Sequence, residues 1–290
     1  MDYHKDRFTD YSLLVFKEGK LIALLPANLN KDTLHSHQGL TYGGLVFTEK
    51  LKFNTVLQIF KSILKYLSEQ NITSLNLKLL PVIYSNVPND ELDYLMYLTQ
   101  AKLTRRDALA VLDNRVKPNL SKDRINGYKR GVKHGLVVKE ETNFDAFWTT
   151  ILIPNLKAKH NTNPVHSLAE ITALKQNFPK QIRQFNVYKE DILVAGTTIF
   201  ESEHVAHSQY ISGNSDKNEL GSLDYLYYYL ITDVFKAKRN FDFGISNENN
   251  GRQVNQGLQY WKEGFGARTT TQDFYTVETN NYKLLDAVMI

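Results

Sequence analysis

Apolar residues recur along the chain with two different periods, and these periods predict where helices and strands lie. A period of about 3.6 residues predicts helices over 54–70, 91–98, 122–134, 144–159, 167–177 and 222–239. Alternation or short apolar runs predict strands over 75–81, 109–113, 136–141, 182–189, 192–201, 207–213, 241–244 and 269–277. Two apolar runs around Gly19 predict a hairpin over 12–26. The stretch 35–47 is expected to be extended, and its glycines mark either turns or a close approach of backbone to a ligand.

Polar residues at the expected helix starts support three of these helices. Ser121 and Asn143 are predicted N-caps, because their side-chain oxygens can accept a hydrogen bond from a free backbone N–H. Ser167 with Glu170 has the spacing of a capping box.

The order of elements partly repeats, since both halves contain a hairpin, a strand, a helix and a strand. We therefore expect a tandem repeat with lobes over 1–135 and 136–290, the first shortened because it lacks a leading strand and helix pair. The predicted fold class is α/β (α+β), with mixed, largely antiparallel sheets flanked by helices.

Composition narrows the class of protein. The 290 residues are 42% hydrophobic and 23% charged, as in a globular protein with a full core. The absence of cysteine excludes disulfides, thiolate metal sites and cysteine nucleophiles. No apolar run is long enough for a membrane span, and residues 1–7 lack the apolar segment of a signal peptide. We expect a soluble cytoplasmic protein without a transmembrane segment, with peripheral membrane contact left open.

Charge is modest overall but concentrated in one segment. The formal net charge of +4 is too small for a dedicated DNA binder. Basic residues gather over 117–139, among them Arg130 and Lys133. This segment is either a solvated helix face or a clamp for phosphates.

Several polar residues are candidates for chemistry. His160, His166, His204 and His207 do not have the spacing of a metal site, and we expect no metal. Asp242 interrupts an apolar strand, so it is either satisfied by hydrogen bonds or an acid or base. Tyr210 and His166 are weaker candidates for a base. Hydrolase, zinc-protease and Walker-type motifs are absent from the sequence.

Two further features concern charge stabilisation. Gly221 and Ser222 open the helix that follows a strand ending at Gly213, so backbone N–H groups there could hold an anion. The alternative is that the aromatic residues of this helix pack it against a sheet. Lys262 lies among aromatic residues, where it either stabilises negative charge or extends its ammonium into water.

These features together resemble the GNAT acyltransferase superfamily, in its Fem-type (FemAB-like) branch with two lobes in tandem. In the first lobe the resemblance depends on Pro26 and Tyr42-Gly-Gly-Leu-Val46. In the second it depends on Tyr128-Lys-Arg-Gly-Val-Lys133, Gln209-Tyr-Ile-Ser-Gly213, Phe241-Asp-Phe-Gly244 and Trp261-Lys-Glu-Gly-Phe-Gly-Ala267.

The resemblance implies transfer of an acyl or aminoacyl group to an amine of a cell-wall (peptidoglycan) precursor or an amino sugar. The donor would be an acyl-CoA such as acetyl-CoA, or an aminoacyl-tRNA. Lys262 matches the lysine that precedes the family's Phe-Gly pair, while Arg130, Lys133 and Tyr42 would bind the acceptor. Of the coenzyme A motif only Gly221 is present, since Asn218 and Leu223 occupy its other places. The competing hypothesis is a non-catalytic protein that binds RNA or a phosphorylated glycan through 117–139.

Overall fold

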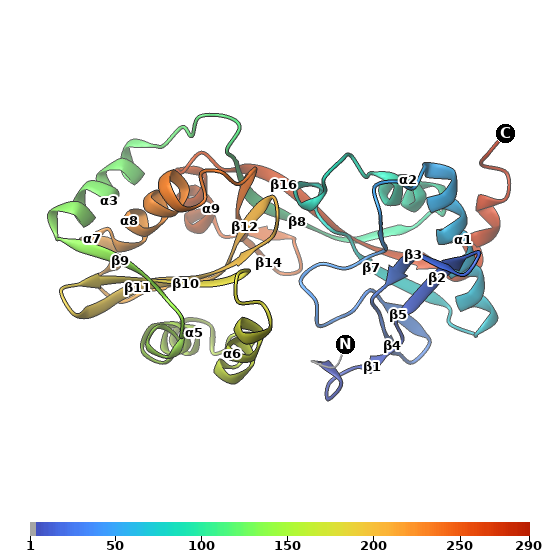
Figure 1. Cartoon of the computed structure of the whole chain (residues 1–290), viewed down its shortest axis with the longest axis horizontal. Coiled ribbons are helices and arrows are strands. Elements are labelled where there is room, and N and C mark those ends of the chain that lie inside the picture. The colour runs from blue at the N-terminus through green and yellow to red at the C-terminus, as the bar shows by residue number, and fades with distance from the viewer. Residues whose placement is uncertain (1–3) are drawn as a thin grey trace. The chain divides into compact units, whose positions relative to one another are not determined.

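The computed structural model describes residues 4–290, which form two compact units (Figure 1). Residues 1–3, part of the stretch in which no signal peptide is expected, lie outside the described residues. Unit 1 contains the chain up to Asp107 together with Thr271–Ile290, and unit 2 is Ala108–Thr270. This division differs from the predicted boundary at residue 135, because the basic helix packs within unit 2 and the last strand returns to unit 1.

Unit 1 contains a mixed sheet and a small three-stranded sheet. The mixed sheet has the strand order β1 (Thr9–Asp10), β4 (Asn28–Asn30), β5 (Thr33–His35), β7 (Ser74–Lys78) and β16 (Arg268–Glu278, in unit 1 from Thr271 on). The small sheet contains β2 (Leu13–Lys17), β3 (Lys20–Leu25) and β6 (Val46–Phe47). In the mixed sheet β5 and β7 are parallel, whereas β1, β4 and β5 pair in sequence as antiparallel neighbours, as do β7 and β16.

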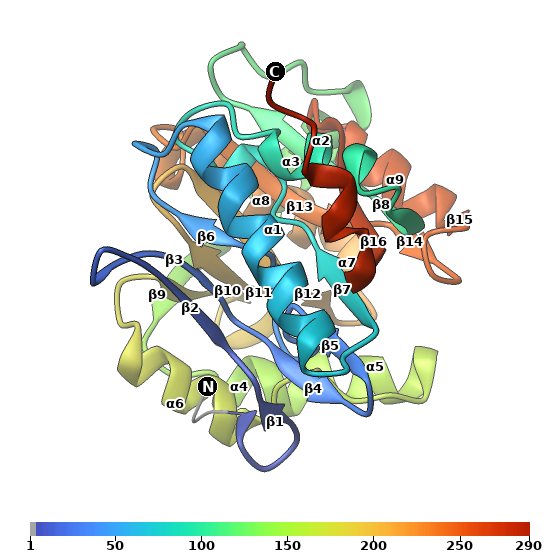
Figure 2. The same cartoon turned by 90° about the vertical axis from the view of Figure 1, so that its right-hand side faces the viewer.

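Helices complete unit 1. They are α1 (Phe53–Glu69), α2 (Glu91–Leu98) and the short 3₁₀ turns η2 (Val82–Tyr84) and η5 (Thr279–Leu285). Seven apolar side chains of α1 are buried and join those of β7 in one core. Figure 2 shows α1 as the long helix of this unit. The helical spacing of its apolar residues therefore produces one face that covers the sheet.

Unit 2 contains the second sheet, in the order β8 (Lys102–Asp113, in unit 2 from Ala108), β13 (Asn240–Ile245), β12 (Val205–Gly213), β11 (Ile192–Glu201), β10 (Ile182–Lys189) and β9 (Leu136–Glu141). Within this sheet β12 and β13 are parallel and the other neighbours antiparallel. The small strands β14 (Asn247–Glu248) and β15 (Gln253–Val254) form a separate pair. Both sheets are thus mixed and largely antiparallel, as predicted.

Helices flank both faces of the second sheet (Figure 1). One group is α3 (Lys122–Lys133), α7 (Lys217–Leu220), α8 (Ser222–Tyr229), η4 (Leu230–Val234) and α9 (Gln256–Glu263). The other is α4 (Asp145–Phe147), η3 (Trp148–Leu152), α5 (Ile153–His160) and α6 (Leu168–Asn177). The aromatic core of the first group surrounds Tyr227, which contacts the rings of Phe241, Phe243 and Trp261.

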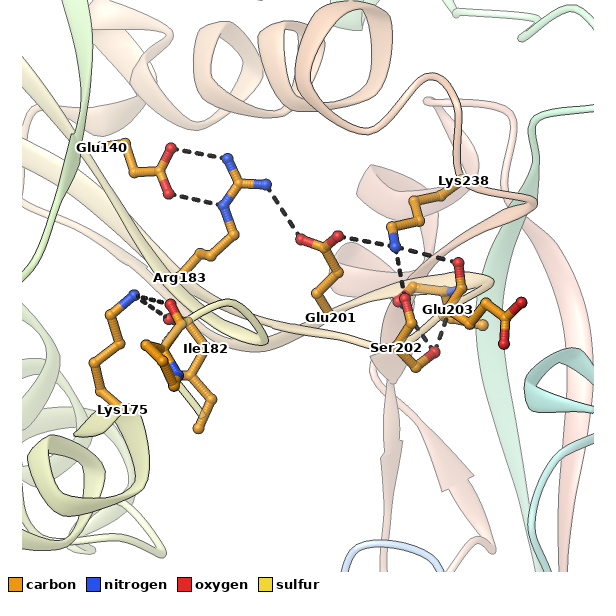
Figure 3. Close-up of polar contacts among 10 residues, drawn as sticks. Glu140, Lys175, Ile182, Arg183, Glu201, Ser202, Glu203 and Lys238 are labelled. Atoms are coloured by element: carbon orange, nitrogen blue, oxygen red, sulfur yellow. Dashed lines mark hydrogen bonds and ion pairs between the residues drawn. The ribbon is translucent and has the colours of Figure 1, made fainter. Parts of the chain in front are cut away.

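Charged side chains connect the outer strands of this sheet. Arg183 on β10 donates to Glu140 on β9 at 2.7 Å and to Glu201 on β11 at 3.2 Å (Figure 3). Lys238 pairs with the same Glu201 at 2.8 Å. One arginine therefore bridges three adjacent strands, as expected for opposite charges on neighbouring strands.

Local predictions succeeded where the apolar period was strong. The helix 91–98, the hairpin around Gly19, the Ser121 cap and the Ser167–Glu170 capping box are confirmed. In the stretch 35–47, residues 36–45 form bends and turns between β5 and β6, and the chain turns at His37 with a φ of 56°, so the glycines mark turns, one of the two expected alternatives. Two expectations were wrong. Asn143 does not cap, since the helical run starts after Phe144. The helix from Ser222 changes to a π-turn at Leu230 and ends before residue 239.

Candidate active site

The parallel strands of unit 2 pair over three residues and then part. Val205 lies opposite Asn240, Ala206 opposite Phe241, and His207 opposite Asp242. Within residues 4–290 no further β12–β13 pair follows, although β12 continues along β11 to Gly213. The backbone edge of β12 beyond His207 is therefore not used by β13, and the last pair lies at the point where the strands separate.

That last pair forms a histidine–carboxylate contact. Nδ1 of His207 lies 2.8 Å from Oδ2 of Asp242, which is fully buried. The other carboxylate oxygen accepts from the backbone N–H of Gly244 at 2.7 Å. Opposed residues of neighbouring strands project to the same face, so the register itself brings these side chains together. A buried carboxylate in this position accepts a hydrogen bond from the imidazole and so orients the ring.

Lys262 is adjacent to this pair. Its ammonium donates to the carbonyls of Gly244 at 3.0 Å and Ile245 at 2.7 Å, and the residue is only 3% exposed. Burial lowers its pKa to about 8, and the charge of Asp242 partly offsets that effect. The expectation that the ammonium might extend into water is wrong. Lys262 instead holds positive charge at the end of β13, beside Asp242.

Tyr210 and His166 form a second polar pair on the same sheet face. On β11, Phe200 lies opposite His207 and Thr198 lies opposite Tyr210, while Gln209 between them is an unpaired bulge. Because Phe200 and Thr198 are two residues apart on β11, His207 and Tyr210 lie on the same face of the sheet. The Tyr210 hydroxyl lies 2.6 Å from Nδ1 of His166 and accepts from the His166 backbone N–H at 3.2 Å. These two contacts hold the Tyr210 hydroxyl against the loop that precedes α6.

The bulge residue itself has unused hydrogen-bonding capacity. Gln209 has no opposite residue on β11, and its Oε1 is buried without a hydrogen-bond partner among the described residues. An extra strand residue of this kind often redirects a strand beside a functional site.

The predicted anion cradle is largely covered. Gly221 has a φ of 68°, and a Cβ there would lie 2.2 Å from the carbonyl oxygen of Gly127 on α3. The glycine is thus required by helix packing. Ser222 is fully buried, and its Oγ has no hydrogen-bond partner within the described chain. The carbonyl of Gly213 accepts from the Asn155 side chain at 2.9 Å.

The basic helix α3 is anchored through a buried ion pair. Arg124 donates to Asp224 on α8 at 2.6 Å, and Trp261 donates to the same carboxylate at 2.8 Å. Burial raises the pKa of Asp224, and Arg124 partly offsets this. Arg130 lies 4.0 Å from Asp224, while Lys133 is exposed in the last turn. The segment is therefore partly structural and partly a basic surface.

The structure brings together Asp242 and Lys262 and places Tyr210 with His166 on the face of His207. Arg130, Gly221 and Ser222 belong instead to the α3–α8 contact. Tyr42 belongs to unit 1, where its hydroxyl lies 2.7 Å from that of Tyr84. Sequence reasoning missed His207 as a partner of Asp242. His207 and Asp242 are each a polar residue in an apolar strand, which is visible in the sequence. That the two lie opposite each other is known only once the strands are paired.

Residues 4–290 contain neither a cluster of metal ligands nor a membrane-spanning helix. No group of three or more potential ligands (His, Cys, Asp or Glu) in this range could hold a metal ion. None of the described helices combines the length and apolar character needed to cross a bilayer.

Comparisons with known proteins identify the fold. The sequence matches no protein-family model and no curated protein at a significant level. The C-terminal domain of an Agrobacterium fabrum protein described as a lysylphosphatidylglycerol synthetase is 12% identical over 94% of this chain and 87% of its own, with a TM-score of 0.61. FemX is 10% identical over 93% of this chain and 89% of its own, with a TM-score of 0.65.

A tandem GNAT protein from the clavulanic acid biosynthesis pathway is 13% identical over 92% of this chain and 82% of its own, with a TM-score of 0.50. At such identities the likeness concerns the fold. The chain therefore has a tandem GNAT fold of the Fem type, as its motifs predicted.

Proposed function

We propose that unit 2 is an acyltransferase centre that moves an acyl or aminoacyl group from an activated donor to an amine. The observation that carries this proposal is the His207–Asp242 pair at the point where β12 and β13 part. The likeness in fold to FemX and to a tandem GNAT protein supports the reaction class.

The reaction needs a base, because an amine that attacks an acyl carbon must lose a proton. The new C–N bond forms as the bond from the acyl carbon to the donor's sulfur or oxygen breaks. His207 would accept the amine proton and pass it to the leaving group, while Asp242 stabilises the imidazolium. Asp242, which the sequence offered as an acid or base, would thus orient the base His207 instead of acting as the base itself.

Negative charge on the acyl oxygen requires stabilisation in the transition state. The ammonium of Lys262 donates to two carbonyls, which leaves one N–H beyond those bonds. We assign Lys262 an electrostatic role and assign the backbone of the Gln209 bulge a role as hydrogen-bond donor. Tyr210 and His166 would hold this part of β12 in place.

We propose an acyl-CoA such as acetyl-CoA as the donor, with aminoacyl-tRNA as the alternative. Gly213, Gly221 and Ser222 were expected to bind the donor, but Asn155 and helix α3 cover them, so we assign them no contact to it. For the acceptor we propose an amine of a cell-wall precursor or amino sugar, with the exposed Arg130 and Lys133 near its phosphates. Tyr42 stays a candidate contact to the acceptor.

Donor binding is tested by the melting temperature of the protein during titration with acetyl-CoA and with free coenzyme A. A ligand that binds only the folded state stabilises it by about 2.7 kcal/mol at 100 times its Kd. We expect a saturable increase with both compounds and no increase with a matched concentration of pantothenate. Absence of any increase at millimolar acetyl-CoA would rule out this donor and leave aminoacyl-tRNA to be tested.

A further inference from the structure

Unit 1 contains a pocket at its own pair of parallel strands. Its volume is about 360 Å³, and it is bordered by β5, β7, β16 and the bend that follows β5. The polar side chains used below are those of His37, Gln38, Asn76, Lys78 and Thr276.

The pocket occupies the position in unit 1 that the His207–Asp242 pair occupies in unit 2. Strands β5 and β7 pair over three residues, Thr33 opposite Ser74, Leu34 opposite Leu75 and His35 opposite Asn76. The parallel pair of unit 2 likewise pairs over three residues and likewise ends on a histidine. The two units thus repeat one backbone arrangement, but an amide replaces the carboxylate in unit 1.

Internal hydrogen bonds occupy acceptor atoms of the side chains that line this pocket, and they leave N–H donors of the same side chains for a ligand. Asn76 Oδ1 accepts from the Thr276 hydroxyl at 2.6 Å, and Gln38 Oε1 accepts from the Asn28 amide at 2.9 Å. His37 Nδ1 accepts from the backbone N–H of Gly39 at 3.1 Å, so its proton lies on Nε2. The amide nitrogen of Asn76 lies 3.5 Å from Nδ1 of His35 and has a second N–H beyond that contact. The groups that face a ligand are therefore mainly N–H groups.

The pocket also carries positive charge, which suits an anion as the N–H groups do. Lys78 donates to the carbonyl of Leu40 at 2.5 Å, and none of the described residues that line the pocket carries a carboxylate. The nearby Arg105 is neutralised by Asp107 at 2.7 Å, whereas Lys78 has no such partner among the described residues. Burial lowers the pKa of Lys78, as it does those of His35 and His37. A half-buried ammonium without a counter-ion is stabilised by a bound anion.

We propose that this pocket binds the anionic group, a phosphate or a carboxylate, of a small ligand, with Lys78 as its counter-ion. An anion is acceptor-only, so it satisfies the amide of Gln38, the amide of Asn76 and Nε2 of His37 together with the lysine. This site is separate from the transfer centre proposed for unit 2 and does not depend on it.

Isothermal titration calorimetry with sodium phosphate and with sodium acetate, at constant ionic strength in chloride buffer, tests the proposal. Lys78→Met should weaken binding about 10-fold or more, because a charge-assisted hydrogen bond is lost. Lys20→Met, at an exposed lysine of the same unit, should leave binding unchanged.

A second variant and a second readout guard against unfolding. Gln38 is exposed, so Gln38→Ala should stay folded and weaken binding by roughly 3-fold or more. In the wild type, the ligand should shift the ring resonances of His35 and His37 but not that of His207. Binding of either anion supports the proposal, and the preferred one identifies the chemistry. No binding of either at ~10 mM, or full binding by Lys78→Met, would overturn it.

Discussion

The two units contain the same three-residue parallel pairing, each ending on a histidine, but the partner of that histidine differs. In unit 2, His207 meets a fully buried carboxylate at 2.8 Å. In unit 1, Nδ1 of His35 lies 3.5 Å from the amide nitrogen of Asn76. A carboxylate accepts a hydrogen bond from the imidazole, whereas an amide nitrogen donates one to it.

The lysines of the two sites differ in a matching way. Lys262 is held by two backbone carbonyls beside Asp242, so its positive charge has a nearby negative partner. Lys78 has one carbonyl and no carboxylate partner within the described residues. One backbone arrangement thus carries a lysine beside a carboxylate in unit 2 and, among the described residues, a lysine without one in unit 1.

The largest expected effect comes from making unit 2 resemble unit 1. Asp242→Asn replaces the carboxylate by the amide that unit 1 has, and it should reduce transfer by about 10²- to 10⁴-fold, the usual contribution of a positioned base. The measurement is the turnover number at saturating donor and acceptor.

The control is Asn54→Asp, at an exposed position of α1 in unit 1, which should leave the turnover number within roughly 2-fold, since this position is part of neither site. Normal turnover by Asp242→Asn would show that His207 does not need its carboxylate.

A smaller effect is expected on the pH dependence of stability, because the pKa of the buried Lys262 is lowered. The pKa of Lys262 is lowered from 10.5 to about 8, so between these pH values the unfolded state binds more protons than the folded state. Stability should therefore increase with pH in this range, relative to Lys262→Met. At about 1.4 kcal/mol for each pH unit, the full gain approaches ~3 kcal/mol. Denaturant unfolding of both proteins between pH 7 and pH 10 measures it.

The same titration should act on activity in the opposite direction. If the ammonium stabilises the acyl oxygen, wild-type turnover decreases as pH rises through about 8. The turnover of Lys262→Met should be low at every pH in this range and lack that decrease. Parallel pH profiles of the two proteins would remove Lys262 from the mechanism and leave it a structural role.

Much of the fold was predictable because local patterns determine it. The helix 91–98 and the cap at Ser121 depend on neighbouring residues, and they were placed correctly. The extent of the helix from Ser222 was not, because a π-turn at Leu230 follows from packing. The sequence indicated an anion cradle at Gly221 because nothing local shows that α3 covers it.

The candidate site was predictable only in part, for a related reason. Asp242 and Lys262 were identified because each is polar in an apolar or aromatic context. Their proximity, and the role of His207, depend on the register of two strands that are 35 residues apart along the chain (207 to 242). A single sequence does not contain that register, whereas the chemistry depends on it.

The measurement that tests the central claim most directly compares His207→Gln with His35→Gln in one transfer assay. Acetyl-CoA is supplied with a panel of amino sugars and amino acids, and a thiol reagent detects the coenzyme A released. The protein has no cysteine, so its own chain gives no background. We expect His207→Gln to lose about 100-fold or more of the turnover number and His35→Gln to stay within roughly 3-fold of wild type. Equal losses in the two variants, or a larger loss in His35→Gln, would contradict the assignment of chemistry to unit 2.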